Sequence, residues 1–303
     1  MSSRKQRARV TPFKETPVKS AEVSEGLLDD RYQFASLLTL LFSLLAASST
    51  FGQTTTVLAL AGAALALYRQ RWFWPTFFVV ALLKFFTGSI FSLDNHSWLF
   101  LYWVLTLAIY SLVLPSEKHF KLAARLLIAF SFVFATAWKV LSPEFRSGSF
   151  FTFAGAVESR FTGLFEMLGL QAHGTGNNNT YYLQQWIVSN PPTGFQLVNN
   201  AELHPFWIFL TFATIAVEAS VAILFLIPLA QKRAWMRDAL LAGFCVGTYI
   251  LMPVIGFGHL LCILGYTQSS LDEKKRRYLY AGLMIFIQAT MLRDSLASGV
   301  TGN

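Results

Sequence analysis

The chain has 303 residues, of which 54% are hydrophobic and only 13% are charged, and its mean hydropathy is +0.48. A soluble domain carries about a quarter charged residues, so this composition excludes an ordinary soluble protein and indicates an all-α, polytopic transmembrane helical bundle. The net charge of +8 comes from short basic clusters between apolar runs, which is typical of membrane topology and argues against a nucleic-acid partner.

The N-terminal segment, residues 1–33, is polar and contains Pro12, Pro17 and mixed charges. It lacks the apolar core of a signal peptide, so we expect a disordered cytoplasmic tail. Its first twenty residues hold six Lys or Arg against one Glu. Contact with anionic lipid is therefore an alternative to a plain solubilising role.

Apolar runs of membrane-spanning character follow this tail. They predict spans near residues 34–50, 54–68, 73–92, 97–115, 121–141, 204–230 and 277–293. One further segment, 238–268, is too long for one straight span and too short for two ordinary ones. Pro253, Gly256 and Gly258 interrupt it, which predicts a broken helical hairpin.

Basic clusters decide how many crossings are expected. With the N-terminus in the cytoplasm, three basic loops also face the cytoplasm, at 69–71, 118–121 and 231–237. A single crossing by 238–268 would place the cluster at 274–277 outside, whereas a hairpin keeps it inside. We therefore expect about eight or nine helical passes within a domain over 34–293, and a short external tail, 294–303.

One long external region, 142–203, separates two of the spans. Its stretch "SFFTFAGAVESRFTGLFEMLGL" places six apolar side chains on one helical face: Phe150, Ala154, Val157, Phe161, Leu164 and Leu168. This pattern predicts one amphipathic helix on the outer surface. "QAHGTGNNNT" then predicts a polar loop, and "YYLQQWIVSNPPTGF" a second short amphipathic piece that ends at Pro191.

Two ionisable residues lie within apolar spans, Lys84 and Glu218. Each costs roughly 2.5–3.5 kcal/mol at bilayer depth on insertion scales, so each needs a reason to be there. One hypothesis is a structural Lys84–Glu218 ion pair, since both residues reach a similar depth. The other is a protonated Glu218, or a Glu218 that belongs to a proton path.

His259 follows the interruption in 238–268, where freed backbone groups favour a cavity. It is either part of a site or a hydrogen-bonded structural residue. We see no metal-ligand spacing, and no motif of phosphate loops, zinc proteases, nucleophile elbows or dinucleotide folds. Cys245 and Cys262 lie in apolar stretches and are expected to be small buried hydrophobic residues.

Lys139 stands beside Trp138 near the outer end of its predicted span. Lysine and tryptophan at a span end are usually interfacial anchors. A lysine in an apolar wall is also suited to act as a base, because desolvation disfavours its charged form. The residues alone leave both roles open.

Three stretches in order, "ATAWKVLSPEFRSGSFF", "VEASVAILFLIP" and "GFGHLLCILGY", resemble the vitamin K-dependent carboxylase-like (HTTM) membrane proteins, and more distantly the DoxX-type proteins. The resemblance covers about residues 34–293. It implies that Lys139 is a catalytic base acting on a quinone or hydroquinone, that His259 shares its cavity and that Glu218 tunes it. Phe145 stands where the family usually has Trp, and no large domain follows the last span, so a complete peptide carboxylase is not expected.

Three functions remain open. The first is a modifying enzyme with quinone-linked or peptide-modifying chemistry in an outward-facing intramembrane cavity. The second is a non-enzymatic assembly or maturation subunit that binds a membrane or secreted peptide partner. The third is a transporter, which the broken helix alone favours.

Overall fold

The computed structural model describes residues 30–45, 52–87, 95–113, 116–172, 174–189, 197–198, 201–230, 233–251, 254 and 256–300. Every regular element in these ranges is helical and none is a strand, which confirms the predicted all-α class. Most of the predicted tail 1–33 lies outside the described residues. Its last residues are helical, because the first helix begins at Asp30.

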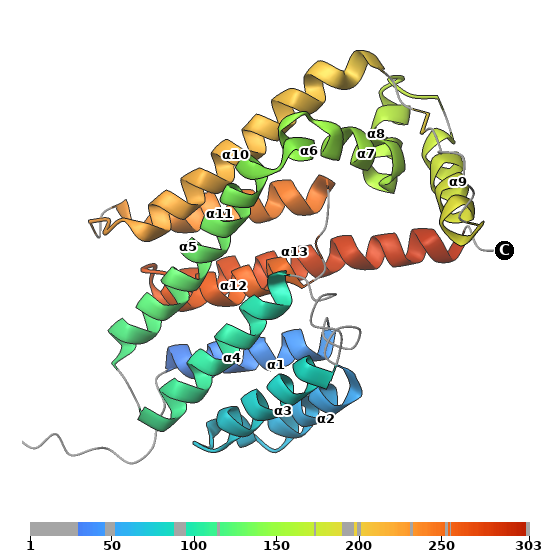
Figure 1. The fold of residues 1–303 in the computed structure, drawn as a ribbon. Coiled ribbons are helices and arrows are strands. Elements are labelled where there is room, and N and C mark those ends of the chain that lie inside the picture. The colour runs from blue at the N-terminus through green and yellow to red at the C-terminus, as the bar shows by residue number, and fades with distance from the viewer. Residues whose placement is uncertain are drawn as a thin grey trace, which may run out of the picture.

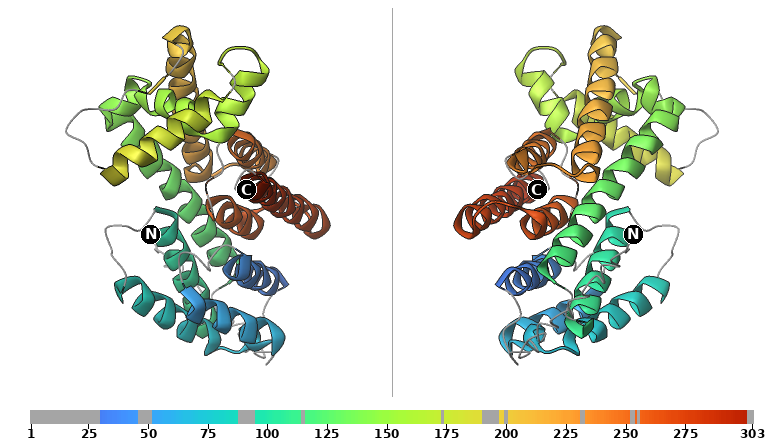
Figure 2. Two further views of the ribbon diagram at one scale, coloured as in Figure 1. Left: turned by 90° about the vertical axis from the view of Figure 1, so that its right-hand side faces the viewer. Right: turned by 90° about the vertical axis from the view of Figure 1, so that its left-hand side faces the viewer.

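Within the described ranges, nine helices occupy the places of the predicted spans. They are α1 (Asp30–Leu45), α2 (Gly52–Ala64), α3 (Phe73–Thr87), α4 (Asn95–Val113), α5 (Glu117–Leu141), α10 (His204–Leu226), α11 (Trp235–Leu251), α12 (Phe257–Gln268) and α13 (Glu273–Val300). Figures 1 and 2 show α1–α4 at one end of the molecule and α10 at the other. α5 joins the two ends, because it packs against α4, α10 and α12.

Three of the described helices are long and apolar enough to cross a membrane: His96–Val113 within α4, the whole of α5 and the whole of α10. The 25 residues of α5 give a helix of about 37 Å, which exceeds a hydrocarbon core of about 30 Å. These helices indicate that the protein associates with a membrane. α2 and α3 are apolar but shorter.

Arg31 holds α1 in place, although sequence analysis had assigned it to the tail. Its guanidinium is 5% exposed, and Nη1 donates to the carbonyls of Thr267 at 2.7 Å and Ser269 at 2.8 Å. These carbonyls belong to the C-terminal end of α12, where a cation also meets the negative end of the helix dipole. Nε forms an ion pair with Glu117 at 2.9 Å. The start of α1 is therefore part of the folded domain.

The predicted break within 238–268 is present, because α11 ends at Leu251 and α12 begins at Phe257. α11 and α12 lie side by side in opposite directions. The hydroxyl of Tyr249 donates to the Val254 carbonyl and accepts from the Gly258 amide, so one side chain replaces backbone bonds across the break. Gly256 takes a φ of 85°, which favours glycine. Pro253 lies outside the described residues.

The predicted single amphipathic helix in the external region is two helices, α7 (Ser149–Val157) and α8 (Ser159–Met167), preceded by the short α6 (Pro143–Arg146). The chain turns at Glu158, whose backbone is extended. Both helices pack on Trp207 of α10, and a side-chain carbon at Gly155 would overlap the Trp207 ring. The face predicted to lie on a surface is thus partly buried within the protein.

Two other boundaries differ from the prediction. α9 (Thr175–Ser189) begins within the stretch expected to be a polar loop. Asn179 explains this, because its buried amide bonds to the carbonyls of Ala156 and Val198 and to the Val198 amide. α13 extends to Val300, so most of the predicted tail 294–303 is helical.

Candidate functional site

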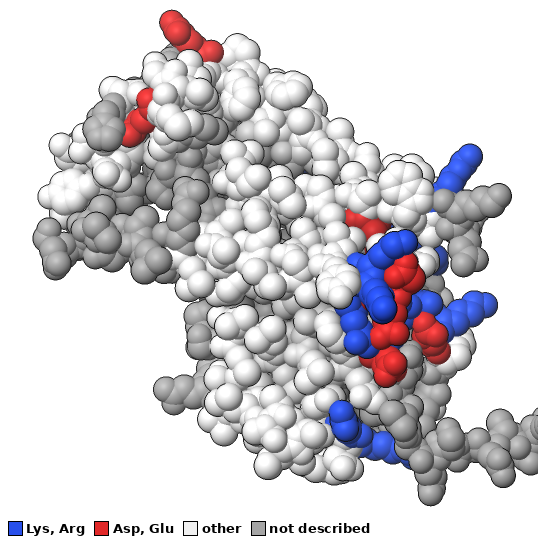
Figure 3. Space-filling view, turned by 180° about the vertical axis from the view of Figure 1, so that it is seen from behind, with Lys and Arg blue, Asp and Glu red and all other residues white. Residues whose placement is uncertain are grey.

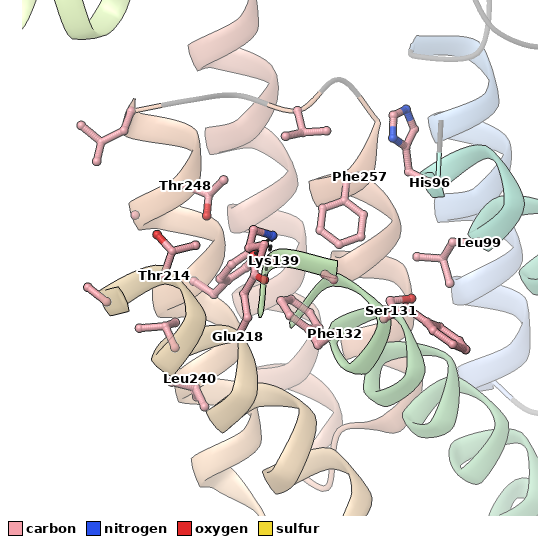
Figure 4. Close-up of a pocket in the computed structure, with 18 of the residues that line it drawn as sticks. His96, Leu99, Ser131, Phe132, Lys139, Thr214, Glu218, Leu240, Thr248 and Phe257 are labelled. Atoms are coloured by element: carbon pink, nitrogen blue, oxygen red, sulfur yellow. Dashed lines mark hydrogen bonds and ion pairs between the residues drawn. The ribbon is translucent and has the colours of Figure 1, made fainter. Parts of the chain in front are cut away.

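Lys139 and Glu218 form an ion pair between α5 and α10. The Lys139 ammonium donates to both carboxylate oxygens of Glu218 at 2.8 Å each. The two helices pack along each other, with Lys139 in the last turn of α5 and Glu218 in the middle of α10. The Lys139 side chain is 20% exposed and that of Glu218 is 8% exposed. The pair therefore sits in a mostly desolvated wall and is visible in Figure 4.

The Lys84–Glu218 pair proposed from the sequence is wrong. Lys84 lies on α3 and is exposed, whereas Glu218 lies on α10 and binds Lys139. α3 and α10 lie at opposite ends of the molecule in Figures 1 and 2. The ion-pair hypothesis for Glu218 named Lys84 as the cation, and the packing of α5 against α10 supplies Lys139 instead.

The ammonium of Lys139 has one donor to spare. An ammonium has three N–H groups, and Glu218 takes two of them. The nitrogen lies 5.4 Å from the ring centroid of Phe145, a distance at which the ring attracts the cation. Since no further acceptor for Nζ lies among the described residues, the third N–H is available to an oxygen acceptor beside Phe145.

A large cavity lies against this ion pair. Its volume is about 1660 Å³, and its walls come from α4, α5, α6, α7, α8, α10, α11, the start of α12 and Val254 before it. Nine phenylalanines line it: Phe130, Phe132, Phe134, Phe145, Phe150, Phe151, Phe161, Phe244 and Phe257. Besides the ion pair, the lining side chains with polar atoms are His96, Trp98, Tyr102, Ser131, Thr214 and Thr248. Ligand cavities of about 300–1000 Å³ hold drug-sized molecules, so this one has room for a longer, largely apolar one.

The structure brings two of the three predicted site residues together. Lys139 and Glu218 both line the cavity, whereas His259 does not. His259 is fully buried on α12, and its ring lies 6.0 Å from that of Phe42 on α1. Phe257, two residues earlier, provides the cavity wall instead. His259 belongs to the packing between α1 and α12, so its predicted place in the cavity is not observed.

Sequence analysis missed several residues of the cavity wall. Thr214 lies one turn before Glu218 on the same face of α10, a spacing that the sequence shows. Gly243 and Gly247 share a face of α11 in the same way. A side-chain carbon at either glycine would meet no atom within 4 Å, so both glycines leave the cavity open. His96 lines the cavity from the start of α4 and carries no comparable sequence signal.

Comparisons of the chain with protein-family models, with curated proteins and with solved structures found no match. In the described part of the chain, no three His, Cys, Asp or Glu side chains are grouped so that they could hold a metal ion. The geometry around Lys139 is therefore the basis for a functional assignment.

Proposed function

We propose that this protein binds a lipid-soluble molecule in the cavity and that Lys139 exchanges a proton with it. The observation that carries the proposal is a desolvated lysine, paired with Glu218, that faces a cavity of about 1660 Å³ lined mainly by phenylalanine. An apolar wall with few polar groups favours a ligand whose polar part is small. The spare N–H of Lys139 marks where that polar part would bind.

A quinone or hydroquinone fits these residues. Its ring would pack among the phenylalanines near Phe145, and one ring oxygen would bind the ammonium of Lys139. When bound, such a molecule supplies redox chemistry that the side chains lack. The resemblance of "ATAWKVLSPEFRSGSFF" to the carboxylase-like HTTM proteins supports the same class.

The ion pair can also hold a mobile proton. The Lys139 nitrogen donates a hydrogen bond to the Glu218 carboxylate across 2.8 Å, a distance over which a proton can pass. With this proton on Glu218, Lys139 would be a neutral amine and could act as a base. Glu218 acts in this scheme as the residue that positions Lys139 and takes its proton.

The proposal includes an orientation in the membrane. We place the N-terminus and the basic loops in the cytoplasm, and residues 142–203 and the C-terminus outside, with about eight or nine helical passes. In support, the Lys and Arg side chains visible in Figure 3 gather at one side of the molecule. Lys139 lies at the far end of α5 from Lys118 and Lys121. The cavity beside Lys139 would then open towards the outside.

A non-enzymatic assembly or maturation subunit is the second candidate. It is favoured by α9, which exposes Tyr181, Tyr182, Ile187 and Val188. Exposed aromatic and aliphatic side chains of this kind are typical of a surface that meets a peptide partner or lipid.

Filling the cavity tests whether it binds a ligand. The probe is a decyl-substituted benzohydroquinone, titrated onto the purified full-length protein in an uncharged detergent. Gly247→Leu should weaken binding by about tenfold or more, because the new side chain occupies the open wall of α11. Gly282→Leu is the matched control, since Gly282 on α13 also faces open space but does not line the cavity. Equal binding by wild type and Gly247→Leu would exclude this cavity as the site.

Lys139→Arg tests the proton-transfer role. Arginine keeps the charge and the reach, but it does not give up its proton near neutral pH. The variant should match wild type in folded yield and lose the product or phenotype of the host pathway. Lys139→Met, which is slimmer and uncharged, checks that the loss does not come from the larger guanidinium; because this variant is expected to be less stable, it is compared with wild type at equal folded yield. Full function in both variants would remove Lys139 from the chemistry.

A further inference from the structure

Arg125 is a partly buried cation near the basic end of α5. Its Nε is buried without a hydrogen-bond partner, and no hydrogen bond or ion pair joins its guanidinium to another described residue. The other buried arginines in the described ranges, Arg31, Arg237 and Arg276, each have partners. A desolvated guanidinium with unused donors is costly, so this side chain indicates a missing acceptor.

Arg237 on α11 is a second cation near Arg125. Seven residues further along each helix, on the same faces as the two arginines, Phe132 of α5 and Phe244 of α11 are in contact, with ring centroids 4.8 Å apart. The positive charge of Arg125 opposes that of Arg237. Arg237 is 5% exposed and caps the end of α10, because Nε donates to the Leu224 carbonyl at 2.8 Å and Nη2 to the Ile227 carbonyl at 2.6 Å. A guanidinium has five N–H donors, so three of those on Arg237 remain.

Asp238 is the acid whose charge acts on Arg237. Its Oδ1 already accepts from the Tyr280 hydroxyl at 2.5 Å and from the Gln268 amide at 3.2 Å. One carboxylate cannot neutralise two guanidinium groups. The cluster therefore keeps a net positive charge in a place that is largely closed to water.

The arginine pair lies next to the basic end of the cavity. Phe132, seven residues after Arg125 on the same face of α5, and Phe244, seven residues after Arg237 on the same face of α11, both line the cavity. Arg125 and Lys139 are separated by about 21 Å along α5, at 1.5 Å per residue. The cavity thus has the ion pair at one end and two arginines beside the other.

We propose that Arg125 and Arg237 together bind a phosphate group, supplied by the headgroup of an anionic phospholipid whose acyl chains enter the basic end of the cavity. Guanidinium groups bind phosphate through parallel pairs of N–H···O bonds, and the two side chains have the free donors for it. The apolar walls at Phe132 and Phe244 suit acyl chains. This inference goes beyond the proposed function, since it assigns a second ligand that takes no part in proton exchange.

Thermal unfolding of the full-length protein in uncharged detergent tests the site. Phosphatidylglycerol should raise the unfolding temperature of wild type, and phosphatidylcholine should not. Arg125→Gln should raise by about tenfold or more the phosphatidylglycerol concentration that gives half of the maximal temperature shift, because charge-assisted hydrogen bonds to the phosphate are lost. Arg125→Lys should reverse part of this increase. The same titration with inorganic phosphate distinguishes the sources: an equal effect shows a phosphate site without lipid specificity, and a weaker one shows that the lipid is the ligand.

Lys275→Gln is the matched control. Lys275 belongs to the same basic end, is 76% exposed and pairs with Asp272, so its loss changes the net charge equally without touching the cluster. This variant should respond to phosphatidylglycerol as wild type does. Counting co-purified phospholipids by native mass spectrometry gives a second readout if Arg125→Gln unfolds too easily. The site is refuted if Arg125→Gln retains the full lipid effect, or if Lys275→Gln loses as much of it.

Discussion

Lys139 and Glu218 place two charges in a wall where either alone would be costly. Glu218→Met leaves the Lys139 ammonium without its acceptor, and Lys139→Met leaves the Glu218 carboxylate without its donor. Loss of one partner of a buried pair costs about 3–5 kcal/mol, and the partial exposure of Lys139 lowers this to about 2–3 kcal/mol. Each single variant should therefore unfold at a lower temperature in detergent. The double variant Lys139→Met with Glu218→Met should recover most of the loss.

The control for this cycle is Lys274→Met, which should change stability by less than about 0.5 kcal/mol because Lys274 is exposed at the start of α13. If the two single losses simply add in the double variant, Lys139 and Glu218 do not stabilise each other.

The sequence was sufficient to mark Glu218 as a residue that needs a partner, because its cost in an apolar span is large. It did not identify the partner. Lys84 and Lys139 both belong to apolar helices, and only the packing of α5 on α10 decides between them. Helix packing also decides which side chains line the cavity: Lys139 lines it, whereas His259 packs against Phe42 of α1.

At the scale of helices, the break between α11 and α12 depends on Tyr249 and Gly258. A side-chain carbon at Gly258 would overlap the Tyr249 ring, which itself bonds across the break. Gly258→Ala should therefore destabilise the protein by about 1–3 kcal/mol, as overpacking does. Gly282→Ala should be neutral or stabilising by up to about 1 kcal/mol, because its site is open and alanine favours a helix. The unfolding temperatures of the two variants are compared. Equal changes would mean that the Tyr249 hydrogen bonds across the break do not contribute to stability.

The glycine and proline residues within 238–268 predicted this break correctly, because their effect on a helix is local and can be read from the sequence. Periodicity failed for α7 and α8, where one continuous apolar stripe is divided at Glu158. The cause lies on Trp207, roughly fifty residues away in the chain, which packs against both helices. A local pattern contains no information about such a distant contact.

For the whole molecule, the proposed orientation makes a prediction for labelling from outside. Single cysteines at Ser147 and Asn178 should react with an impermeant thiol reagent added to intact cells, because both positions are exposed in the external region. Cysteines at Lys118 and Lys275 should react only after the cells are permeabilised. Reaction of the Lys275 variant in intact cells would mean that α11 and α12 do not return to the side on which they began.

Composition predicted the all-helical class, and charge placement predicted the orientation that this labelling examines. Neither predicted the cavity. Residues of α5, α10 and α11 bound it together, and small residues such as Gly243 and Gly247 leave it open, so the cavity is a property of several helices at once.

The arginines that cap helix ends would have two successive roles during biosynthesis, first in membrane insertion and then in folding. Arg237 belongs to a basic loop that can orient the emerging chain, yet in the finished protein its charge is buried against the carbonyls of Leu224 and Ile227. Arg31 is hidden in the same way against the end of α12. The insertion machinery therefore meets more positive charge than a molecule approaching the mature surface does. In the proposed orientation, the side chains that would orient the chain during insertion are therefore the ones that bind helix ends once the bundle has assembled.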